Sequence, residues 1–247
     1  MQTILSVKNV SVTYPVGDLG EVGLKEYLFR RLRGEGRCER AMAVRGVSFA
    51  LGRGELLGIV GGNGAGKSTL LKAVSGVLKP SEGKIERHGV QATLLELGSG
   101  FDGDLSVWEN IFLRGALLGY PREFMKRMAP EILEFAELTS VRERPFKHLS
   151  SGMRSRLAFS IASLVEPDLL ILDEVLAVGD GAFRKKSEER MRRVIASGTA
   201  TVLVSHSLRE LRELSTKLLW LERGACVYYG EDVTGALKEY EERMKKG

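Results

Sequence analysis

The glycine-rich segment GGNGAGKST, at residues 61–69, limits most strongly what this chain can fold into. It matches the pattern G-x-x-x-x-G-K-[ST] in full and follows the apolar run ELLGIV at residues 55–60. Glycines let the backbone curl until its N–H groups point inward, and the helix that begins near Lys67 adds positive potential there. The segment therefore predicts a phosphate-binding loop between a buried strand and a helix.

The residues of this loop have separate expected roles in holding ATP. We expect Lys67 to contact the β- and γ-phosphates as a point charge and Ser68 to give its hydroxyl group to Mg²⁺. The other loop residues are expected to surround the phosphates: Gly61, Asn63, Gly64, Ala65, Gly66 and Thr69. A glycine-rich turn that matches by chance is the alternative, and the strand before it and the helix after it speak against that interpretation.

A second candidate element is the run LLILDE at residues 169–174, where an apolar strand ends in two carboxylates. Open α/β sheets bind their ligands at the carboxyl ends of the strands. We expect Asp173 to hold Mg²⁺, usually through water, and Glu174 to polarise the attacking water as the catalytic base. An acidic pair that is only solvated is the alternative, and the phosphate-binding loop upstream weakens it.

The apolar pattern predicts an α/β fold with a largely parallel sheet, because short apolar runs alternate with helical patterns. Near-continuous apolar runs predict central strands covered by helices on both faces: residues 55–60, 168–173 and 199–205. Segments that alternate between apolar and polar residues predict an antiparallel sheet beside that core: residues 6–14, 43–51, 83–89 and 91–97. A further hairpin is predicted near the end of the chain, with its turn at Arg223–Gly224.

The middle of the chain reads as helical, and its pattern predicts an inserted helical subdomain. The candidate helices are Leu105–Tyr120, Pro121–Leu138 and Ser150–Val165. Ser106 and Glu109 have the spacing of a capping box at the start of the first helix. Pro130 is expected to kink or split the second. A last helix, Val233–Met244, carries an apolar stripe that predicts docking as a lid.

Composition and charge exclude several classes of protein. With 43% hydrophobic and 28% charged residues the chain resembles an ordinary globular protein, and no run approaches the roughly 18 apolar residues of a membrane helix. The start of the chain lacks the pattern of a signal peptide, so we expect a cytoplasmic location. Cys38 and Cys226 stand far apart without nearby histidines, which argues against a zinc site or a disulfide. The basic stretch Lys25–Arg45 is interpreted as a solvated face, with contact to anionic lipid or substrate as the alternative.

The segment LSSGMR at residues 149–154 narrows the choice among nucleotide-binding proteins. It resembles the L-S-G-G-Q signature of ABC ATPases, with Ser151 and Met153 in place of the usual Gly and Gln. Ser150 is expected to cap a helix whose free N–H groups form a second anion site, and Gly152 would allow close approach. By resemblance, Ser150, Ser151 and Gly152 face the γ-phosphate of ATP held by a second subunit. A Ser-Ser-Gly helix cap taken alone would more often be structural.

Further positions are similar to those of ABC ATPases. His206, after the strand at 199–205, resembles the switch histidine that reaches the γ-phosphate, and Asp180 matches the loop through which two subunits sense each other. Tyr14 is the candidate to stack on adenine, with an ordinary edge-strand tyrosine as the alternative. Glu96 stands where most members have a Gln that contacts Mg²⁺ and the membrane domain. A carboxylate can also bind magnesium, so the resemblance places Glu96 among the metal ligands.

Three segments resemble the ATPase subunits of bacterial polysaccharide exporters in particular: residues 94–111, 150–160 and 173–180. That family also uses Glu at the position of Glu96. The resemblance implies an ATP- and Mg²⁺-dependent homodimer that powers the export of a lipid-linked polysaccharide, such as O-antigen, capsule or teichoic acid, through a separate integral membrane permease. It implies a peripheral location on the cytoplasmic face of the inner membrane and no nucleic-acid partner. Some members carry a further sugar-binding domain, so a subgroup without it and a fragment both stay open.

The resemblance implies the ABC ATPase fold, a P-loop NTPase core with an antiparallel β subdomain and an inserted α-helical subdomain. The expected divisions are a core over 1–97 and 161–232, a helical subdomain with the signature over 98–160, and a C-terminal helix over 233–247. Other cargoes, namely a lipid, a peptide or a drug, stay open. An ABC ATPase that acts on ribosomes or DNA would carry two cassettes or a long coiled coil. The sequence shows neither of these features. A P-loop kinase or GTPase is a further alternative, but the guanine-reading N-K-x-D motif is absent and this alternative leaves the signature segment at 149–154 unexplained.

Overall fold

The computed structural model describes residues 2–16, 39–93, 100–165, 167–173 and 181–246. Within these ranges nine strands form one sheet in the order β4-β1-β2-β9-β8-β3-β7-β6-β5. The strands are β1 (Thr3–Val16), β2 (Glu39–Gly52), β3 (Leu56–Val60), β4 (Glu82–Arg87), β5 (Gln91–Thr93), β6 (Leu169–Asp173), β7 (Ala200–Val204), β8 (Lys217–Glu222) and β9 (Ala225–Gly230). Helices flank this sheet or form a separate lobe.

The parallel core of the sheet is buried on both faces, as its continuous apolar runs predict. In β3, Leu57 and Ile59 point into one hydrophobic cluster, and Leu56 and Val60 point into another on the opposite face. Helix α2 (Lys67–Ser75) covers the first face, while α6 (Gly181–Ala196), α7 (Leu208–Leu214) and α8 (Val233–Lys246) cover the second. The predicted strands at 55–60, 168–173 and 199–205 are therefore confirmed as β3, β6 and β7.

Strands β1, β2 and β4 form the predicted antiparallel part, and β2 joins it to the core through a parallel pair of Arg45 with Ala225. Of the predicted antiparallel segment 91–97, residues 94–97 lie outside the described residues, and the prediction is wrong for residues 91–93, because β5 runs parallel to β6, with Gln91 opposite Leu169. An alternating pattern reports that one face of a strand is apolar and carries no information on strand direction. β5 ends the strand order of the sheet, where such a pattern also fits a parallel strand.

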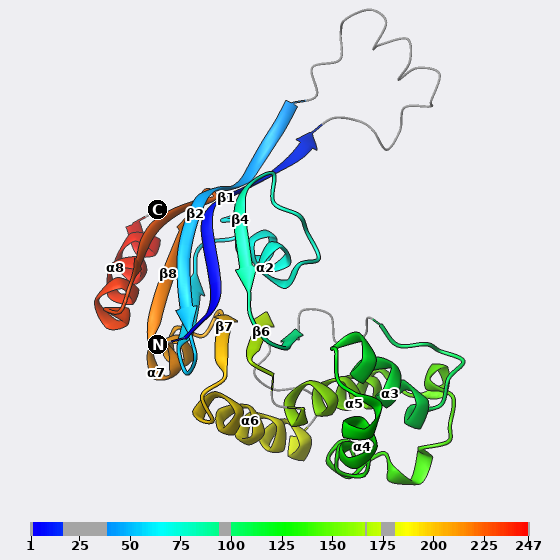
Figure 1. The fold of residues 1–247 in the computed structure, drawn as a ribbon. Coiled ribbons are helices and arrows are strands. Elements are labelled where there is room, and N and C mark those ends of the chain that lie inside the picture. Colours follow the sequence, from blue (N-terminus) through cyan, green and yellow to red (C-terminus); the bar gives the residue numbers. More distant parts are fainter. Residues whose placement is uncertain (1, 17–38, 94–99, 166, 174–180, 247) are drawn as a thin grey trace, which may run out of the picture.

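Helices α3 (Val107–Leu117), α4 (Arg122–Ala136) and α5 (Ser151–Leu164) form a lobe beside the parallel end of the sheet, as Figure 1 shows. This helical lobe has its own hydrophobic cluster, which also includes Phe146 from a short 3₁₀ turn, Phe146–His148. The predicted capping box is confirmed, since Ser106 N–H donates to Glu109 Oε2 at 2.8 Å and Glu109 N–H donates to Ser106 Oγ at 3.1 Å.

Two expectations about helices need correction. Helix α4 runs unbroken through Pro130, so the predicted split is wrong. Pro130 and Lys126, whose carbonyl loses its partner, both lie on the exposed face, where water can satisfy that carbonyl. In α8 the apolar stripe buries Val233 and Leu237, but Met244 is 57% exposed, so the stripe ends before it.

The hairpin near the end of the chain is confirmed. Strands β8 and β9 are antiparallel and joined by two residues, Arg223 with φ of 46° and Gly224 with φ of 82°. Two consecutive left-handed residues make a tight primed turn, which suits the twist of a two-residue hairpin. Within the described ranges, none of the helices has an apolar stretch long enough to traverse a bilayer.

Candidate nucleotide site

Three strand ends of the parallel core meet at one rim of the sheet. β7 lies between β3 and β6, with Val204 opposite both Ile59 and Asp173. The loop at 61–66 leaves β3 at this rim, and His206 follows β7 by two residues. Neighbouring strands lie about 4.8 Å apart, so the strand ends that carry the loop, Asp173 and His206 are within about 10 Å of one another.

The loop holds a conformation that requires glycine at two of its positions. Gly64 has φ of 75° and Gly66 has φ of 99°, values that L side chains rarely adopt. A Cβ atom on Gly66 would collide with the backbone carbonyl of Ala43 in β2. From the other side, Gly224 N–H of the β8–β9 turn donates to Ala65 O at 3.0 Å. Strand β2 and the hairpin therefore brace the loop from behind.

Lys67 spans the mouth of the loop. Its side chain is almost fully buried, and its Nζ donates to Gly61 O at 2.7 Å and to Gly62 O at 3.0 Å. Helix α2 starts at this residue and has no side-chain cap, so the N–H groups of its first turn face the loop. The first turn of α2 thus brings together the ammonium group of Lys67, N–H groups without helical partners and the exposed Ser68, which are groups suited to binding a phosphate chain.

A second helix N-terminus with anion-binding character belongs to the helical lobe. Ser150 is the N-cap of α5, and its Oγ accepts a hydrogen bond from Met153 N–H at 3.2 Å, as the sequence predicts. Ser150, Ser151 and Gly152 are exposed, and a Cβ atom on Gly152 would meet nothing within 4 Å. This N-terminus is therefore open to a ligand or partner, whereas that of α2 is embedded.

These features agree with what the chain resembles among known proteins. Residues 44–177 match the family model described as ABC transporter. The chain belongs to this family. It is 38% identical over 226 residues to the O-antigen export system ATP-binding protein RfbB of Klebsiella pneumoniae, covering 90% of this chain and 91% of that protein. It is 40% identical to the teichoic acids export ATP-binding protein TagH of Bacillus anthracis, over 90% of this chain and 40% of that longer protein.

Solved structures confirm the predicted ABC ATPase fold. A structure of the ATP binding subunit of an ABC transporter has a TM-score of 0.74 at 24% identity, covering 96% of this chain and 93% of that one. The dimeric structure of the ATP-binding cassette MJ0796 bound to ADP and Pi has a TM-score of 0.68 at 20% identity, covering 92% and 98%. As a member of the ABC family, this chain is an ATP-binding ATPase subunit.

Tyr14, the candidate adenine-stacking residue of this ABC ATPase, lies at the end of β1 and is 38% exposed. It pairs with Ala41 of β2, two residues before Ala43, whose carbonyl lies against the loop. Tyr14 therefore sits on the strand next to the one that braces the loop. Its stacking on adenine remains a prediction.

His206 is held in a short turn that the sequence interpretation did not foresee. Ser205 Oγ donates to Glu210 Oε2 at 2.8 Å and accepts from Ser207 N–H at 3.0 Å, and Ser207 caps α7. His206 lies exposed between the two serines. The Ser207-x-x-Glu210 spacing, a capping-box signal, could have revealed this turn.

Three candidate residues of the ABC site lie outside the described residues: Glu96, Glu174 and Asp180. Their predicted roles as metal ligand, catalytic base and subunit contact therefore remain predictions. Of the proposed metal ligands, Ser68 lies in the first turn of α2 and Asp173 at the partly exposed tip of β6.

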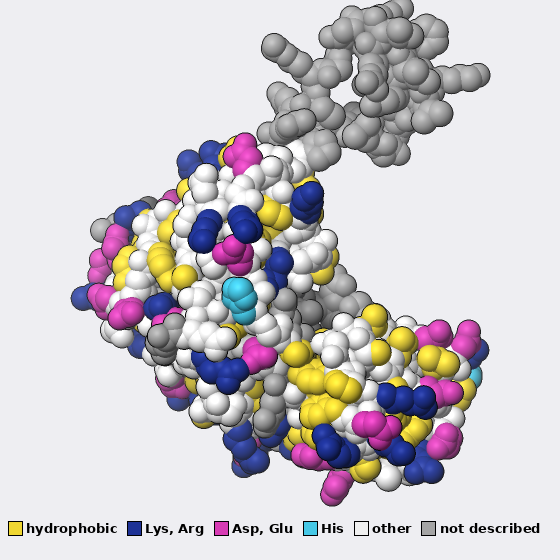
Figure 2. Space-filling view, in the orientation of Figure 1, with side chains coloured by type: hydrophobic (Ala, Val, Ile, Leu, Met, Phe, Trp, Pro, Cys, Tyr) yellow, Lys and Arg dark blue, Asp and Glu magenta, His cyan; other side chains and the backbone are white. Residues whose placement is uncertain are grey.

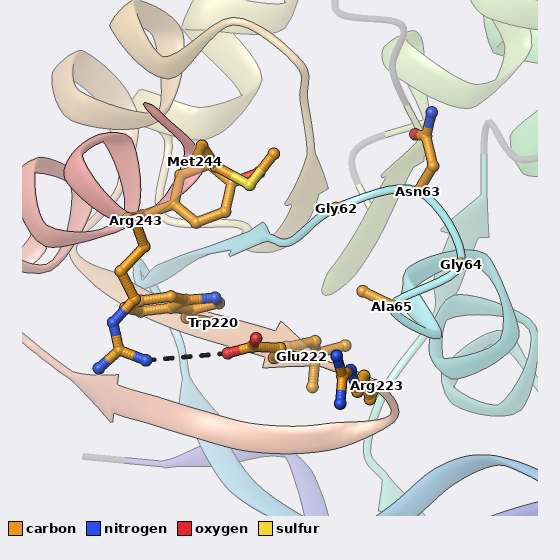
Figure 3. Close-up of a pocket in the computed structure, with 11 residues that line it drawn as sticks. Gly62, Asn63, Gly64, Ala65, Trp220, Glu222, Arg223, Arg243 and Met244 are labelled. Carbon is orange, nitrogen blue, oxygen red and sulfur yellow. Dashed lines mark ion pairs between the residues drawn. The ribbon is translucent and has the colours of Figure 1, made fainter. Parts of the chain in front are cut away.

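A cavity of about 290 Å³ lies between the phosphate-binding loop and α8, as Figure 3 shows. On its α8 side, Arg243 pairs with Glu222 at 3.8 Å and its guanidinium carbon lies 4.7 Å from the ring centroid of Trp220. Asn63 points away from this cluster in Figure 3. The C-terminal helix thus lies across this cavity from the loop.

Proposed function

We propose that this chain is the ATP-hydrolysing subunit of an exporter for a lipid-linked polysaccharide. It works as a homodimer bound to a separate membrane permease on the cytoplasmic face of the inner membrane. The cargo is inferred from relatives named for O-antigen and teichoic acid export, which are 38% and 40% identical over 90% of this chain. The observation that carries the mechanism is the presence of two anion-binding helix N-termini on separate lobes, one embedded and one open.

The dimer follows from the open N-terminus of α5. In this proposal, the loop of one copy holds ATP and Ser150, Ser151 and Gly152 of the other copy contact its γ-phosphate. Only the closed dimer makes both sets of contacts, so ATP binding shifts the equilibrium towards closure. The dimeric MJ0796 cassette, which shares the fold, supports this arrangement. Hydrolysis removes the γ-phosphate and lets the dimer reopen.

The residues at the rim supply oxygen donors and charges suited to phosphoryl transfer. The Ser68 hydroxyl and the Asp173 carboxylate are hard oxygen ligands of the kind that Mg²⁺ prefers, so this donor set fits the ion. When bound, Mg²⁺ would neutralise negative charge on the phosphates. Lys67 holds the β- and γ-phosphates, while Glu174 accepts a proton from the attacking water and His206 orients that water.

We propose that the permease docks on the helical lobe, to which residues 100–119 belong. Figure 2 shows hydrophobic side chains gathered on this lobe beside the hollow between the two lobes. A groove of about 540 Å³ runs between this lobe and the residues that directly precede β5 and β6. Its lining includes Val90, Tyr120, Phe124, Met128 and Asp168. A permease segment bound there would contact both lobes, so a movement of one lobe relative to the other would also move that segment.

Glu174→Gln tests the catalytic half of the proposal. The variant should keep ATP binding, lose turnover and form a dimer with ATP and Mg²⁺, because closure is retained while the base is lost. Phosphate release and sedimentation velocity measure the two effects. Turnover equal to the wild type removes Glu174 as the base, and a variant that stays monomeric with saturating ATP and Mg²⁺ refutes the dimer mechanism.

Deletion of the gene in its native host tests the cargo. The lipid-linked polysaccharide should accumulate on the cytoplasmic side and vanish from the cell surface, and Lys67→Ala should not restore export. Met128→Glu should also fail to restore export while the isolated subunit keeps its fold and ATPase activity, because Met128 lines the docking groove and is only partly buried against the hydrophobic cluster of the lobe. Normal surface polysaccharide in the deletion strain would assign another cargo, such as a lipid, peptide or drug.

A further inference from the structure

Four side chains of the helical lobe form one continuous stack, which we call the Phe101–Phe146 stack. The rings of Phe101 and Phe146 lie 4.5 Å apart with an interplanar angle of 4°. The guanidinium carbon of Arg114 lies 5.2 Å from the Phe101 centroid, and that of Arg154 lies 5.4 Å from the Phe146 centroid. Each ring therefore contacts the other ring and one cation.

The members of the stack come from three separate pieces of the lobe. Phe101 follows closely on the segment that contains Glu96, and Arg114 lies on α3. Phe146 opens the 3₁₀ turn that leads into α5, and Arg154 lies in the first turn of α5. The stack therefore links the chain at Phe101 to the first turn of α5, which Ser150 caps.

Backbone hydrogen bonds join the same two segments. Phe146 N–H donates to Leu105 O at 2.9 Å, and Lys147 N–H donates to Gly103 O at 2.9 Å. The buried side chain of Asn110 anchors one of them, since its Nδ2 donates to Asp102 O at 2.9 Å. With these bonds and the stacked rings, the two segments move as one body.

Arg154 stands at a place that is unfavourable for the helix alone. A cation in the first turn opposes the helix dipole, which favours anions there. Its guanidinium is nevertheless fixed in place, because one Nη donates to Lys147 O at 2.7 Å and the group lies over the Phe146 ring. An arginine fixed at this end adds positive potential beside Ser150. This potential would favour an anion bound at the N-terminus of α5.

We propose that Phe101 and Phe146 are positioning residues for ATP hydrolysis, which orient the N-terminus of α5 towards the γ-phosphate held by the partner copy. This inference rests on the proposed function of the α5 N-terminus. Two parallel rings restrict the tilt of α5 relative to the segment after Glu96 in a way that an aliphatic side chain of similar volume does not.

Phe101→Leu tests the stack, because Phe101 is only partly buried and the variant should fold. Its turnover should fall about three- to tenfold, the range expected for one lost aromatic pair. Placed in the Glu174→Gln background, it should weaken ATP-driven dimerisation by a similar factor. ATP affinity measured at protein concentrations below dimerisation should not change. Phe101→Tyr, which keeps the ring, should retain both turnover and dimerisation. Phe146→Leu should lose turnover and dimerisation as Phe101→Leu does.

Phe112→Leu is the matched control. Phe112 lies on α3, is partly buried, and contacts Trp108 at a centroid distance of 5.3 Å and Arg122 at 5.9 Å, but it is no part of the stack. Suppose that Glu174→Gln dimerises with ATP. If Phe101→Leu then behaves like Phe112→Leu, or if Phe101→Tyr is as impaired as Phe101→Leu, the positioning role is refuted while the proposed function stands. If Glu174→Gln without further substitution does not dimerise with ATP, the proposed function itself fails.

Discussion

The N-termini of α2 and α5 can both hold a phosphate, yet they are built in different ways. At α2 the cap is Gly66 in a left-handed conformation without a side-chain hydrogen bond, and Lys67 behind it is nearly buried. At α5 the cap is the exposed Ser150, whose hydroxyl satisfies a backbone N–H of its own helix. The first N-terminus is braced by the sheet, and the second stands free on a separate lobe.

The difference matches the times at which the two sites are proposed to meet a phosphate. In the proposed mechanism the α2 site binds ATP in a single copy, with its N–H groups held in a loop that β2 and the β8–β9 turn brace. The α5 site would meet the γ-phosphate only when two copies close. Until then its N–H groups face water, and Ser150 satisfies one of them. The proposed difference in function thus matches the difference in capping: the α2 site, complete in one chain, has no side-chain cap, and the α5 site, completed by a second copy, is capped by Ser150.

Lys67→Ala should have the largest effect, because the α2 site lacks a side-chain cap and relies on this ammonium group. We expect turnover to fall at least about 100-fold, as for loss of a charge that stabilises the transition state. Phosphate release and nucleotide titration measure it. Lys72→Ala, in the last turn of the same helix, should remain near wild type. Comparable losses in the two variants would mean that the effect belongs to α2 as a whole.

Ser150→Asp should separate capping from phosphate contact at α5. Aspartate is as good an N-cap as serine, so the thermal stability should hold, while its charge repels the γ-phosphate. Turnover should fall roughly 10- to 100-fold, with ATP affinity of the single copy unchanged. Ser150→Asn, an uncharged cap, should lose less. Full activity of Ser150→Asp would place the γ-phosphate elsewhere.

A matched pair of glycine substitutions contrasts the two sites in stability. Gly66→Ala should destabilise the fold by about 2 kcal/mol or more, because its φ of 99° is strained for alanine and the new methyl group meets Ala43 O. Gly152→Ala lies in α5 with open space around it and should gain up to about 1 kcal/mol, yet lose activity through the blocked approach. Denaturant unfolding with ATPase assays decides, and equal stability of both variants contradicts the contrast.

The exposed ion pair between Lys147 and Asp104, close to the start of α5, should make a small and pH-dependent contribution to stability. Lys147 donates to Asp104 at 2.7 Å, and this hydrogen bond and charge hold the pKa of Asp104 below its ordinary value. A lowered folded-state pKa means that the contribution is present above the ordinary pKa of about 3.9 and is lost as pH falls through the lowered value. Asp104→Asn should therefore lower Tm by about 1 °C at pH 7, because exposed pairs contribute little.

That difference between Asp104→Asn and wild type should vanish in acid. Glu143→Gln is the control, since Glu143 is exposed in the same segment and its ion pair is with the adjacent Arg142. A Tm difference for Asp104→Asn that persists unchanged below pH 3 would mean that the ion pair is not its source.

Local chemistry in the sequence was enough for much of this fold. β3, β6 and β7 are apolar on both faces, so their burial could be predicted, and the Arg223–Gly224 turn and the Ser106–Glu109 capping box are written in neighbouring residues. The direction of β5 could not be predicted, because no residue within a strand encodes which way its neighbour runs. The predicted split at Pro130 was wrong, because the cost of a proline inside a helix depends on whether water reaches the carbonyl that loses its hydrogen bond.

In the site, too, features encoded by neighbouring residues could be predicted, and contacts between distant parts of the chain could not. Lys67, Ser150 and Asp173 sit at the ends of elements whose starts and stops the sequence shows, and the structure places them there. The bracing of the loop by Ala43 and Gly224 was missed, since it joins residues far apart in the chain. The stack of Phe101 on Phe146 was missed for the same reason.

The central claim is that each ATP lies between Lys67 of one copy and Ser150 of the other, and mixing two impaired variants tests it directly. A dimer of Lys67→Ala with Ser150→Asp contains one site with both residues intact and one with neither. We predict that the mixture turns over ATP clearly faster than the sum of the two variants measured alone, with one ATP retained per dimer. A mixture no more active than the sum of its parts would contradict it, because the two residues would then have to act within one chain.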